Sequence, residues 1–127
     1  MAWVTIVAML ALAEYMFFGF KVGQARGKYG VAAPATTGNA MFERHHRVQM
    51  NTLEQLIVFL PALYGFAVFV SSLWAAVLGA VFVVGRALYY AFYLEDPAKR
   101  GPGMLLSLVP NVALVVGALV GASLALA

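Results

Sequence analysis

Residues 42–70 read FERHHRVQMNTLEQLIVFLPALYGFAVFV, a polar run that passes directly into an apolar one. The first part, FERHHRVQMNTLE at residues 42–54, contains two glutamates, two arginines and two histidines. The remainder, from Gln55 to Val70, contains no charged residue. The whole stretch is long enough to cross the roughly 30 Å hydrocarbon core of a bilayer as a helix. It therefore predicts a membrane-spanning helix whose first turns carry charge.

The composition of the whole chain predicts an integral membrane protein. Of its 127 residues, 64% are hydrophobic and 10% are charged, and the mean hydropathy is +0.90. Soluble domains are about half apolar and about one quarter charged, so a soluble domain of this length could not hide so much apolar surface. We expect one all-α membrane domain over residues 1–127, an antiparallel bundle of four helices, because lipid accepts only helices or closed barrels and no segment alternates like a barrel strand. The expected spans are about Ala2–Val22, Phe42–Val70, Leu73–Leu94 and Met104–Leu126.

The connections between these spans differ in charge. The first, from Gly23 to about Met41, is rich in glycine, proline and threonine, so we expect a loop there and not a helix. The third, from Glu95 to Gly103, is a polar break with two prolines. Basic residues gather in or beside these two connections: Lys21, Arg26, Lys28, Arg44, Arg47, Lys99 and Arg100. The second connection and both termini have none. The positive-inside rule then places the first and third connections in the cytoplasm and both termini on the opposite side.

The polar run has a helical phase, in which side chains three, four and seven residues apart share one face. The members of this stripe are Arg44, Arg47, Asn51 and Glu54. Charge at membrane depth costs about 2.5–3.5 kcal/mol per residue, so the stripe either pairs with another helix, for example Glu54 with Arg86, or binds a polar, anionic ligand. Gln49 points about 200° away from Arg47. Because one pocket cannot wrap both faces of a helix, Gln49 favours an oligomer with sites between its subunits.

A second stripe lies on the third span. Arg86, Tyr89 and Tyr93 share a face, Tyr90 leans aside, and Arg100 follows the break. An aromatic belt at the membrane interface would account for tyrosines alone, but less well for two tyrosines in phase with an arginine inside a span. Together the two stripes supply arginines for ligand carboxylates and a glutamate for an amine. Such a set fits a zwitterionic peptide that carries two carboxylates.

Metal and thiol chemistry have little support in the chain itself. His45 and His46 are adjacent, so they point in different directions on a helix and cannot face one metal ion, and we expect no metal site. The chain has no cysteine, so thiol chemistry would require a ligand that brings the sulfur. Glu14 is a lone acid within the first span; pairing with another helix and a functional role both remain open for it.

These motifs resemble those of the MAPEG family, the membrane-associated proteins of eicosanoid and glutathione metabolism, which include microsomal glutathione transferases and leukotriene C synthase. The resemblance covers nearly the whole chain. It rests on AR at residues 25–26, PATTG at residues 34–38, FER-x-x-R-x-Q-x-N-x-x-E at residues 42–54, R-x-x-Y-x-x-x-Y at residues 86–93, and Arg100. Two positions depart from the family pattern: Gln55 stands where a tyrosine is frequent, and Gly27 where a second arginine is frequent. We carry no role over from these two positions.

The resemblance implies a homotrimer of four-helix protomers that binds glutathione between neighbouring subunits, near the cytosolic side. One subunit would contribute Arg47, Asn51 and Glu54. Its neighbour would contribute Arg26, Gln49, Tyr89, Tyr93 and Arg100. In this arrangement Arg100 stabilises the thiolate of glutathione.

The implied activity is that of a glutathione transferase, with or without peroxidase activity, acting on hydrophobic electrophiles. The short chain and simple connections suggest a bacterial member in the inner membrane, with periplasmic termini, for which eicosanoids are not the expected substrates. Two alternatives stay open: a non-enzymatic lipid-binding or scaffold member of the family, and a small multidrug transporter centred on Glu14. The retained glutathione-binding set argues against the first alternative, and the long basic first connection argues against the second.

Overall fold

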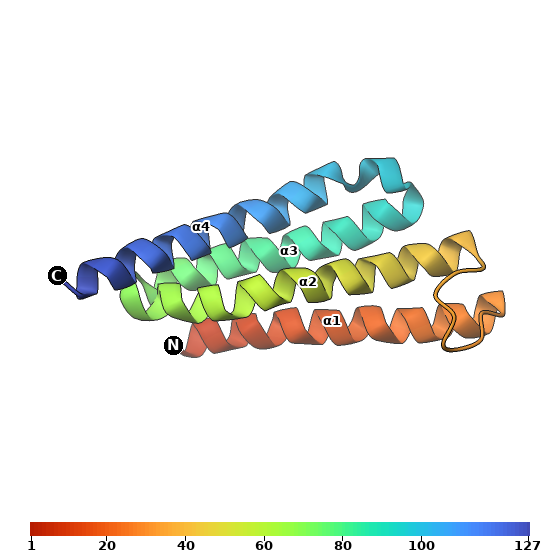
Figure 1. Ribbon diagram of the computed structural model, residues 1–127, viewed down its shortest axis with the longest axis horizontal. Coiled ribbons are helices and arrows are strands. Elements are labelled where there is room, and N and C mark those ends of the chain that lie inside the picture. Colours follow the sequence, from red (N-terminus) through yellow and green to blue (C-terminus); the bar gives the residue numbers. More distant parts are fainter.

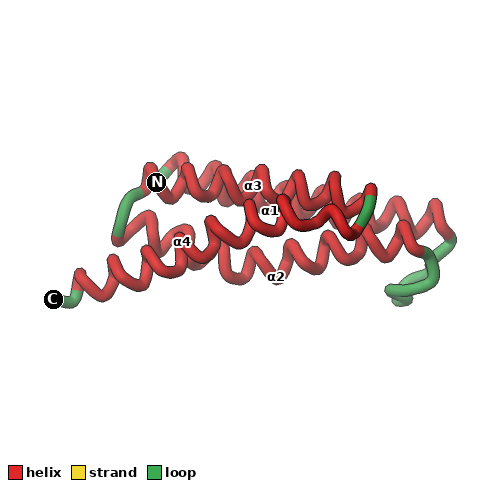
Figure 2. Tube along the Cα trace, turned by 90° about the horizontal axis from the view of Figure 1, so that it is seen from above, coloured by secondary structure: helices red, strands yellow, loops and turns green.

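The computed structural model describes residues 1–127 and is an all-α bundle. The helices are α1 (Ala2–Tyr29), α2 (Ala40–Phe69), α3 (Ser72–Glu95) and α4 (Gly101–Ala125), with a short 3-10 helix, η1 (Pro97–Arg100), before α4. They alternate in direction, so both termini lie at one end of the bundle and the long first connection at the other (Figure 1). Seen from above, the non-helical segments are confined to the ends of the bundle (Figure 2). Four helical segments are long and apolar enough to cross a bilayer, which confirms the predicted integral membrane four-helix architecture.

Helix α1 is longer than its apolar part. We predicted an end near Val22, but the helix continues to Tyr29 and the first connection begins at Gly30. Arg26 and Lys28 lie in the last turn, where positive charge interacts favourably with the helix dipole. Gly30 ends the helix in the left-handed conformation, with φ 68°. The hydropathy of a span marks where the lipid ends, and a helix can continue into water beyond that point.

The break between the third and fourth spans is also shorter than predicted. Asp96 is the only residue between α3 and η1, and its side chain accepts a hydrogen bond from the Ala98 N–H at 3.0 Å. Pro97 and Pro102 lie in the first turns of η1 and α4, where the missing N–H of a proline costs no helical hydrogen bond. The two prolines therefore begin helical segments, and most of the polar break between the third and fourth spans is itself helical.

Glycines allow α3 and α4 to approach each other closely. A Cβ on Gly85 would lie 2.7 Å from the carbonyl carbon of Leu106. A Cβ on Gly103 would collide with the backbone of Tyr89. Small residues at such contacts are common between membrane helices, because they let the backbones pack together. Gly103 thereby sets how closely α4 packs against the helical turn that carries Tyr89.

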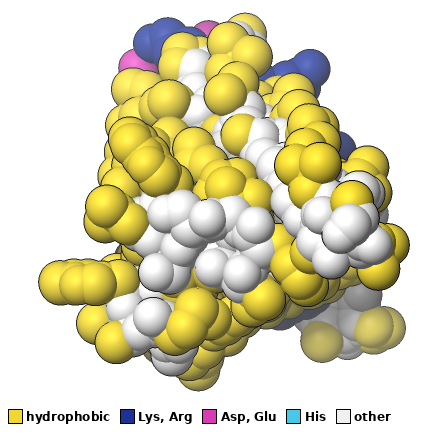
Figure 3. All heavy atoms as spheres, turned by 90° about the vertical axis from the view of Figure 1, so that its left-hand side faces the viewer, with side chains coloured by type: hydrophobic (Ala, Val, Ile, Leu, Met, Phe, Trp, Pro, Cys, Tyr) yellow, Lys and Arg dark blue, Asp and Glu magenta, His cyan; other side chains and the backbone are white.

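The surface of the bundle is mostly apolar. In the view onto the end that carries both termini, hydrophobic and uncharged atoms dominate, and lysine and arginine are visible only at the margins (Figure 3). Large hydrophobic side chains such as Trp3, Phe20 and Leu119 are each more than half exposed. Exposed apolar surface of this extent is not typical of a soluble monomer, and it fits contact with lipid.

Candidate functional site

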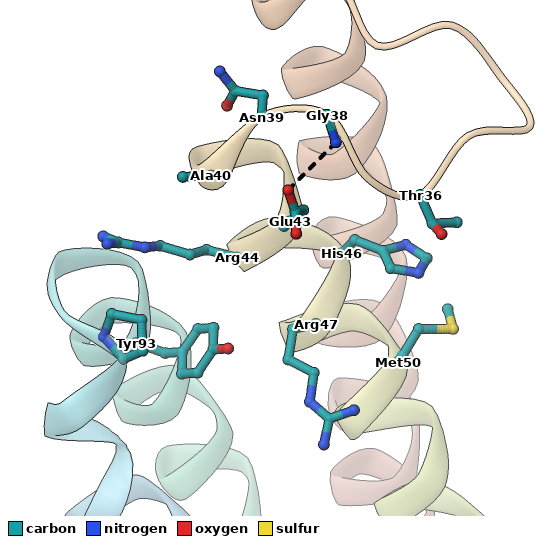
Figure 4. A pocket seen from close by; sticks show the side chains of 11 residues that line it. Thr36, Gly38, Asn39, Ala40, Glu43, Arg44, His46, Arg47, Met50 and Tyr93 are labelled. Atoms are coloured by element: carbon teal, nitrogen blue, oxygen red, sulfur yellow. Dashed lines mark hydrogen bonds between the residues drawn. The ribbon is translucent and has the colours of Figure 1, made fainter.

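A large hollow lies at the end of the bundle that carries the first connection (Figure 4). It has a volume of about 650 Å³, within the range of small-molecule sites. The first connection, the start of α2 and the end of α3 surround it. Its lining residues are Thr36, Gly38, Asn39, Ala40, Glu43, Arg44, His46, Arg47, Met50, Tyr93 and Pro97. Two residues of the predicted glutathione site, Arg47 and Tyr93, are among them. The resemblance assigned these two residues to different subunits, whereas here a single chain brings both to one hollow.

Hydrogen bonds hold the first connection over this hollow. Asn39 caps α2, since its Oδ1 accepts hydrogen bonds from the backbone N–H groups of Met41 at 2.9 Å and Phe42 at 3.0 Å. The Glu43 carboxylate accepts a hydrogen bond from the Gly38 N–H at 3.3 Å. These contacts fix the N-terminal end of α2, and with it the direction of the side chains that enter the hollow.

Arg26 also contacts the first connection. Its Nη1 donates a hydrogen bond to the Ala35 carbonyl oxygen at 2.7 Å. Its guanidinium carbon lies 4.7 Å from the ring centroid of Phe42, within the range of a cation–π contact. Within one chain, Arg26 therefore ties α1 to the connection, and it does not line the large hollow.

Arg44 and Arg47 both line the hollow, but their partners differ. Nη1 of Arg44 donates hydrogen bonds to the carbonyl oxygens of Leu94 at 2.9 Å and Glu95 at 3.3 Å, at the end of α3. Those carbonyls lack partners within the helix, so an arginine there satisfies them. Arg47 is exposed and makes no side-chain hydrogen bond or ion pair within the chain. In Figure 4 its guanidinium extends away from the ribbon into the open space, so Arg47 is free to bind an anion.

The aromatic wall follows the predicted stripe on α3. The rings of Tyr89 and Tyr93 are stacked, with centroids 5.4 Å apart, and the guanidinium carbon of Arg86 lies 4.3 Å from the Tyr89 centroid. Tyr90 turns aside as predicted and stacks on Phe18 of α1, with centroids 5.0 Å apart. Arg86, Tyr89 and Tyr93 thus form a continuous stack from the inside of the bundle to the hollow.

Arg86 is held by uncharged partners. It is 1% exposed, and its Nε and Nη2 donate hydrogen bonds to the Thr52 Oγ1 at 3.2 and 2.8 Å. Its Nη1 donates to the Ser107 Oγ at 3.4 Å. The alternative in which Glu54 pairs with Arg86 is therefore wrong. Glu54 follows Thr52 by two residues, which turns it about 200° around α2 and away from Arg86.

The other predicted site residues do not line the large hollow of the single chain. Gln49 faces α1, where its Nε2 would lie 2.9 Å from a Cβ placed on Gly19. Asn51 is largely buried. Glu54 and Arg100 are exposed, and neither takes part in an ion pair. The opposite orientation of Gln49 and Arg47 agrees with the helical phase, and the role of these residues in one shared site stays a prediction.

A second, mainly apolar groove runs between α2 and α4. It has a volume of about 260 Å³ and is lined by Gln55, Val58, Leu108, Asn111, Val112, Val115 and Val116. Nδ2 of Asn111 donates a hydrogen bond to the Gln55 Oε1 at 2.9 Å, while the buried Oδ1 of Asn111 has no partner. Asn111 is not among the site residues predicted from the sequence, although a polar residue inside a membrane span is itself a signal of function.

The two histidines lie in separate surroundings. His46 lines the large hollow and stacks on Phe42, with ring centroids 6.0 Å apart. His45 faces Tyr90 and a smaller hollow beside α1. The adjacent rings therefore point in different directions, as the helical phase predicted.

The family model and the similar proteins indicate the same family. The MAPEG family model matches residues 4–120. An uncharacterized protein of Synechocystis sp. is 49% identical over 117 residues, which cover 92% of this chain and 85% of that protein. Human microsomal glutathione S-transferase 2 is 38% identical over 102 residues, 80% of this chain and 69% of that protein. Bovine leukotriene C4 synthase is 33% identical over 94 residues, 74% of this chain and 63% of that protein.

Proposed function

The chain belongs to the MAPEG family, and on this premise we propose that it is a membrane-embedded glutathione transferase that acts on hydrophobic electrophiles. The observation that carries the proposal is Arg47, an unpaired cation beside Tyr93 in a hollow of about 650 Å³ at the charged end of a membrane bundle. The relatives named as glutathione S-transferases support the choice of ligand. Family membership leaves the multidrug-transporter alternative without support.

Arg47 is the proposed anchor for a carboxylate of glutathione. An arginine can hold a carboxylate through two parallel N–H···O hydrogen bonds, and the guanidinium of Arg47 has no competing partner in its own chain. The phenol of Tyr93 offers a further hydrogen bond on the same side of the hollow. One chain therefore supplies a cation and a phenol to a single ligand.

The remaining contacts require a neighbouring subunit in our proposal. Glu54 is exposed and unpaired within a span, and a bare carboxylate facing lipid would cost about 2.5–3.5 kcal/mol. A second protomer packed against this face would cover Glu54, and the glutathione amine would neutralise it. We propose a homotrimer in which Asn51 and Glu54 of one subunit meet residues of the next. The proposed contributors from the neighbour are Arg26, Gln49, Tyr89 and Arg100.

The proposed chemistry starts with the glutathione thiol, whose pKa of about 8.5 leaves it mostly protonated at neutral pH. A nearby cation, assigned to Arg100, stabilises the thiolate and so favours release of the proton to water. The thiolate sulfur then attacks an electrophilic carbon, a C–S bond forms, and a leaving group such as chloride departs with the electron pair of its bond. Proximity supplies much of the rate, since both reactants are held at one place.

The groove between α2 and α4 is the proposed path for the electrophile. Five of its lining residues are valine or leucine: Val58, Leu108, Val112, Val115 and Val116. An apolar molecule dissolved in the bilayer could enter this groove without passing through water. Glutathione would arrive from the water at the charged end, which the positive-inside rule assigns to the cytoplasm. In a bacterial cell this arrangement corresponds to the inner membrane with periplasmic termini.

Two measurements on detergent-purified protein test this function. The wild type should conjugate glutathione to a chloro-nitroaromatic and show saturable glutathione binding by calorimetry. Arg47→Ala should abolish the binding, whereas Lys99→Ala, which removes a cation from the same end without touching the hollow, should leave it unchanged. Absence of conjugation by the wild type, or undiminished glutathione binding by Arg47→Ala, would refute the assignment.

A further inference from the structure

A small basic hollow lies between α1 and the first turns of α2. It has a volume of about 160 Å³ and shares no lining residue with the large hollow. Its lining residues are Lys21, Gln24, Ala25, Lys28, Tyr29 and His45. The proposed glutathione site uses none of these residues, so the basic hollow calls for a separate explanation.

The lysines of this hollow have no anionic partner in the chain. The single ion pair of the protein joins Lys99 to Glu95, at 2.7 Å. The lysines of the hollow lie over aromatic rings instead: Nζ of Lys21 is 5.5 Å from the ring centroid of Phe17, and Nζ of Lys28 is 5.3 Å from that of Tyr29. Like charges placed together without an acid repel one another, and a bound anion would relieve that repulsion.

His45 adds an unsatisfied polar group. Its Nδ1 is buried and has no hydrogen-bond partner, although the ring lines the same hollow as both lysines. A buried polar nitrogen without a partner is costly. Because Nδ1 is buried, a ligand oxygen in the hollow can reach only the other ring nitrogen, Nε2, which donates a hydrogen bond in the matching tautomer.

The face of α1 that leads to this hollow changes from apolar to basic along its length. Phe17, Phe20, Lys21, Gln24 and Lys28 fall within about 100° of one another around the helix. The side chains of Phe17 and Phe20 are 46% and 63% exposed. Lys21 follows at the end of the predicted apolar span, and Lys28 lies in the last turn of α1. This order corresponds to lipid tails first and headgroups next.

We propose that the basic hollow binds the phosphate headgroup of an anionic phospholipid. Lys21 and Lys28 bind phosphate oxygens, His45 donates a hydrogen bond from Nε2, and the acyl chains lie along Phe17 and Phe20. The hollow has room for a phosphate group, since its volume of about 160 Å³ is several times the roughly 30 Å³ of one water molecule. Basic pockets between membrane helices are suited to such headgroups.

The test counts bound lipid on the full-length protein. Purified protein in detergent is titrated with phosphatidylglycerol or phosphatidylcholine, and the bound lipid is counted by native mass spectrometry. The wild type should prefer phosphatidylglycerol, because the choline cation of the neutral lipid offsets its own phosphate. The double variant Lys21→Gln/Lys28→Gln should lose this preference and bind phosphatidylglycerol roughly tenfold or more weakly, since each lysine near a membrane surface contributes about 1 kcal/mol.

Controls separate this site from general electrostatics and from folding. Lys99→Gln removes one cation from the same end of the bundle and should bind phosphatidylglycerol like the wild type. Lys28→Gln alone changes an exposed side chain and should weaken binding by a smaller factor, which decides the matter if the double variant does not fold. Three results would overturn the proposal: equal binding of the two lipids, full binding by both lysine variants, or complete displacement of phosphatidylglycerol by an equal concentration of inorganic phosphate.

Discussion

Arg86 and Arg47 lie on neighbouring helices of the same bundle, and their surroundings are opposite. All three guanidinium nitrogens of Arg86 donate hydrogen bonds to Thr52 or Ser107, and the side chain lies against Tyr89. Arg47 has no partner within the chain and faces a hollow. A charge whose three nitrogens all have partners inside the bundle supports the fold, whereas a charge without a partner is available to a ligand. The comparison separates the two arginines by role, although their residue type is the same.

The first prediction tests the contribution of the buried Arg86 to stability, and it has the largest expected effect. Arg86→Ala should lower the free energy of unfolding by about 3–5 kcal/mol, because it removes a large buried side chain and leaves a cavity at the level of Thr52 and Ser107. Arg47→Ala should change it by less than about 0.5 kcal/mol, as is usual for an exposed side chain. Thermal unfolding in detergent, followed by circular dichroism, measures both. Equal losses in the two variants would remove the distinction.

The second prediction tests whether the packing of α3 against α4 positions Tyr93 in the large hollow. Gly103→Val should lower the free energy of unfolding by about 1–3 kcal/mol, because the added atoms collide with the Tyr89 backbone. It should also weaken glutathione binding, since a shift of Tyr89 moves Tyr93, on which it stacks. Gly101→Val is the matched control, because a Cβ there meets no neighbouring atom. Unchanged stability and binding in Gly103→Val would contradict the close approach of α3 and α4.

The third prediction concerns Arg44, which lines the large hollow like Arg47 but has hydrogen-bond partners within the chain like Arg86. Arg44→Ala should lower the free energy of unfolding by about 1 kcal/mol, because the Leu94 and Glu95 carbonyl oxygens lose their charged donor. Because Arg44 is only partly buried, water can hydrogen-bond to the freed carbonyl oxygens and offset some of that loss. Unfolding of Arg44→Ala beside Arg47→Ala measures the difference directly. A smaller effect for Arg44→Ala than for Arg47→Ala would mean that the contact with the end of α3 contributes nothing.

The fourth prediction has the smallest effect on stability and concerns Glu54, which like Arg47 has no partner within the chain. Glu54→Gln should leave the free energy of unfolding of the protomer within about 0.5 kcal/mol of the wild type, since Glu54 is exposed and unpaired. Glutathione binding should weaken about tenfold, because the amine of the ligand loses a charge-assisted hydrogen bond. Calorimetry with glutathione and with a glutathione analogue lacking the amine separates these effects. Equal affinity of both ligands for the wild type would remove Glu54 from the site.

Helical phase accounts for most of what could be predicted. It correctly placed Gln49 and Arg47 on opposite faces of α2, and Arg86, Tyr89 and Tyr93 in one stack. Helical phase depends only on residue spacing, so the relative directions of side chains on one helix stay the same whichever helices it packs against. Hydropathy placed the four spans, but it missed the last turns of α1, because it detects lipid contact and not helix length.

The partners of Arg86 could not be predicted in the same way. Thr52 and Ser107 are hydroxyl residues that often satisfy themselves within their own helix, and both also donate to a carbonyl oxygen one turn earlier. Nothing in their spacing indicates that they also accept hydrogen bonds from a third helix. The charged Glu54 is the more obvious partner by charge, but it lies on the wrong face. For a site shared between subunits, the phase of one chain gives a single indirect sign, the opposite orientation of Gln49 and Arg47, and it does not identify the partner residues.

The ultraviolet difference spectrum of glutathione added to the purified protein tests the central claim most directly. The account predicts thiolate absorbance with the wild type and with Lys99→Ala, and its loss with Arg100→Ala, which removes the cation assigned to the sulfur and leaves Arg47 to hold the ligand. Calorimetry on the same samples establishes that Arg100→Ala still binds glutathione. No thiolate absorbance with the wild type, or an unchanged spectrum with Arg100→Ala, would contradict the account.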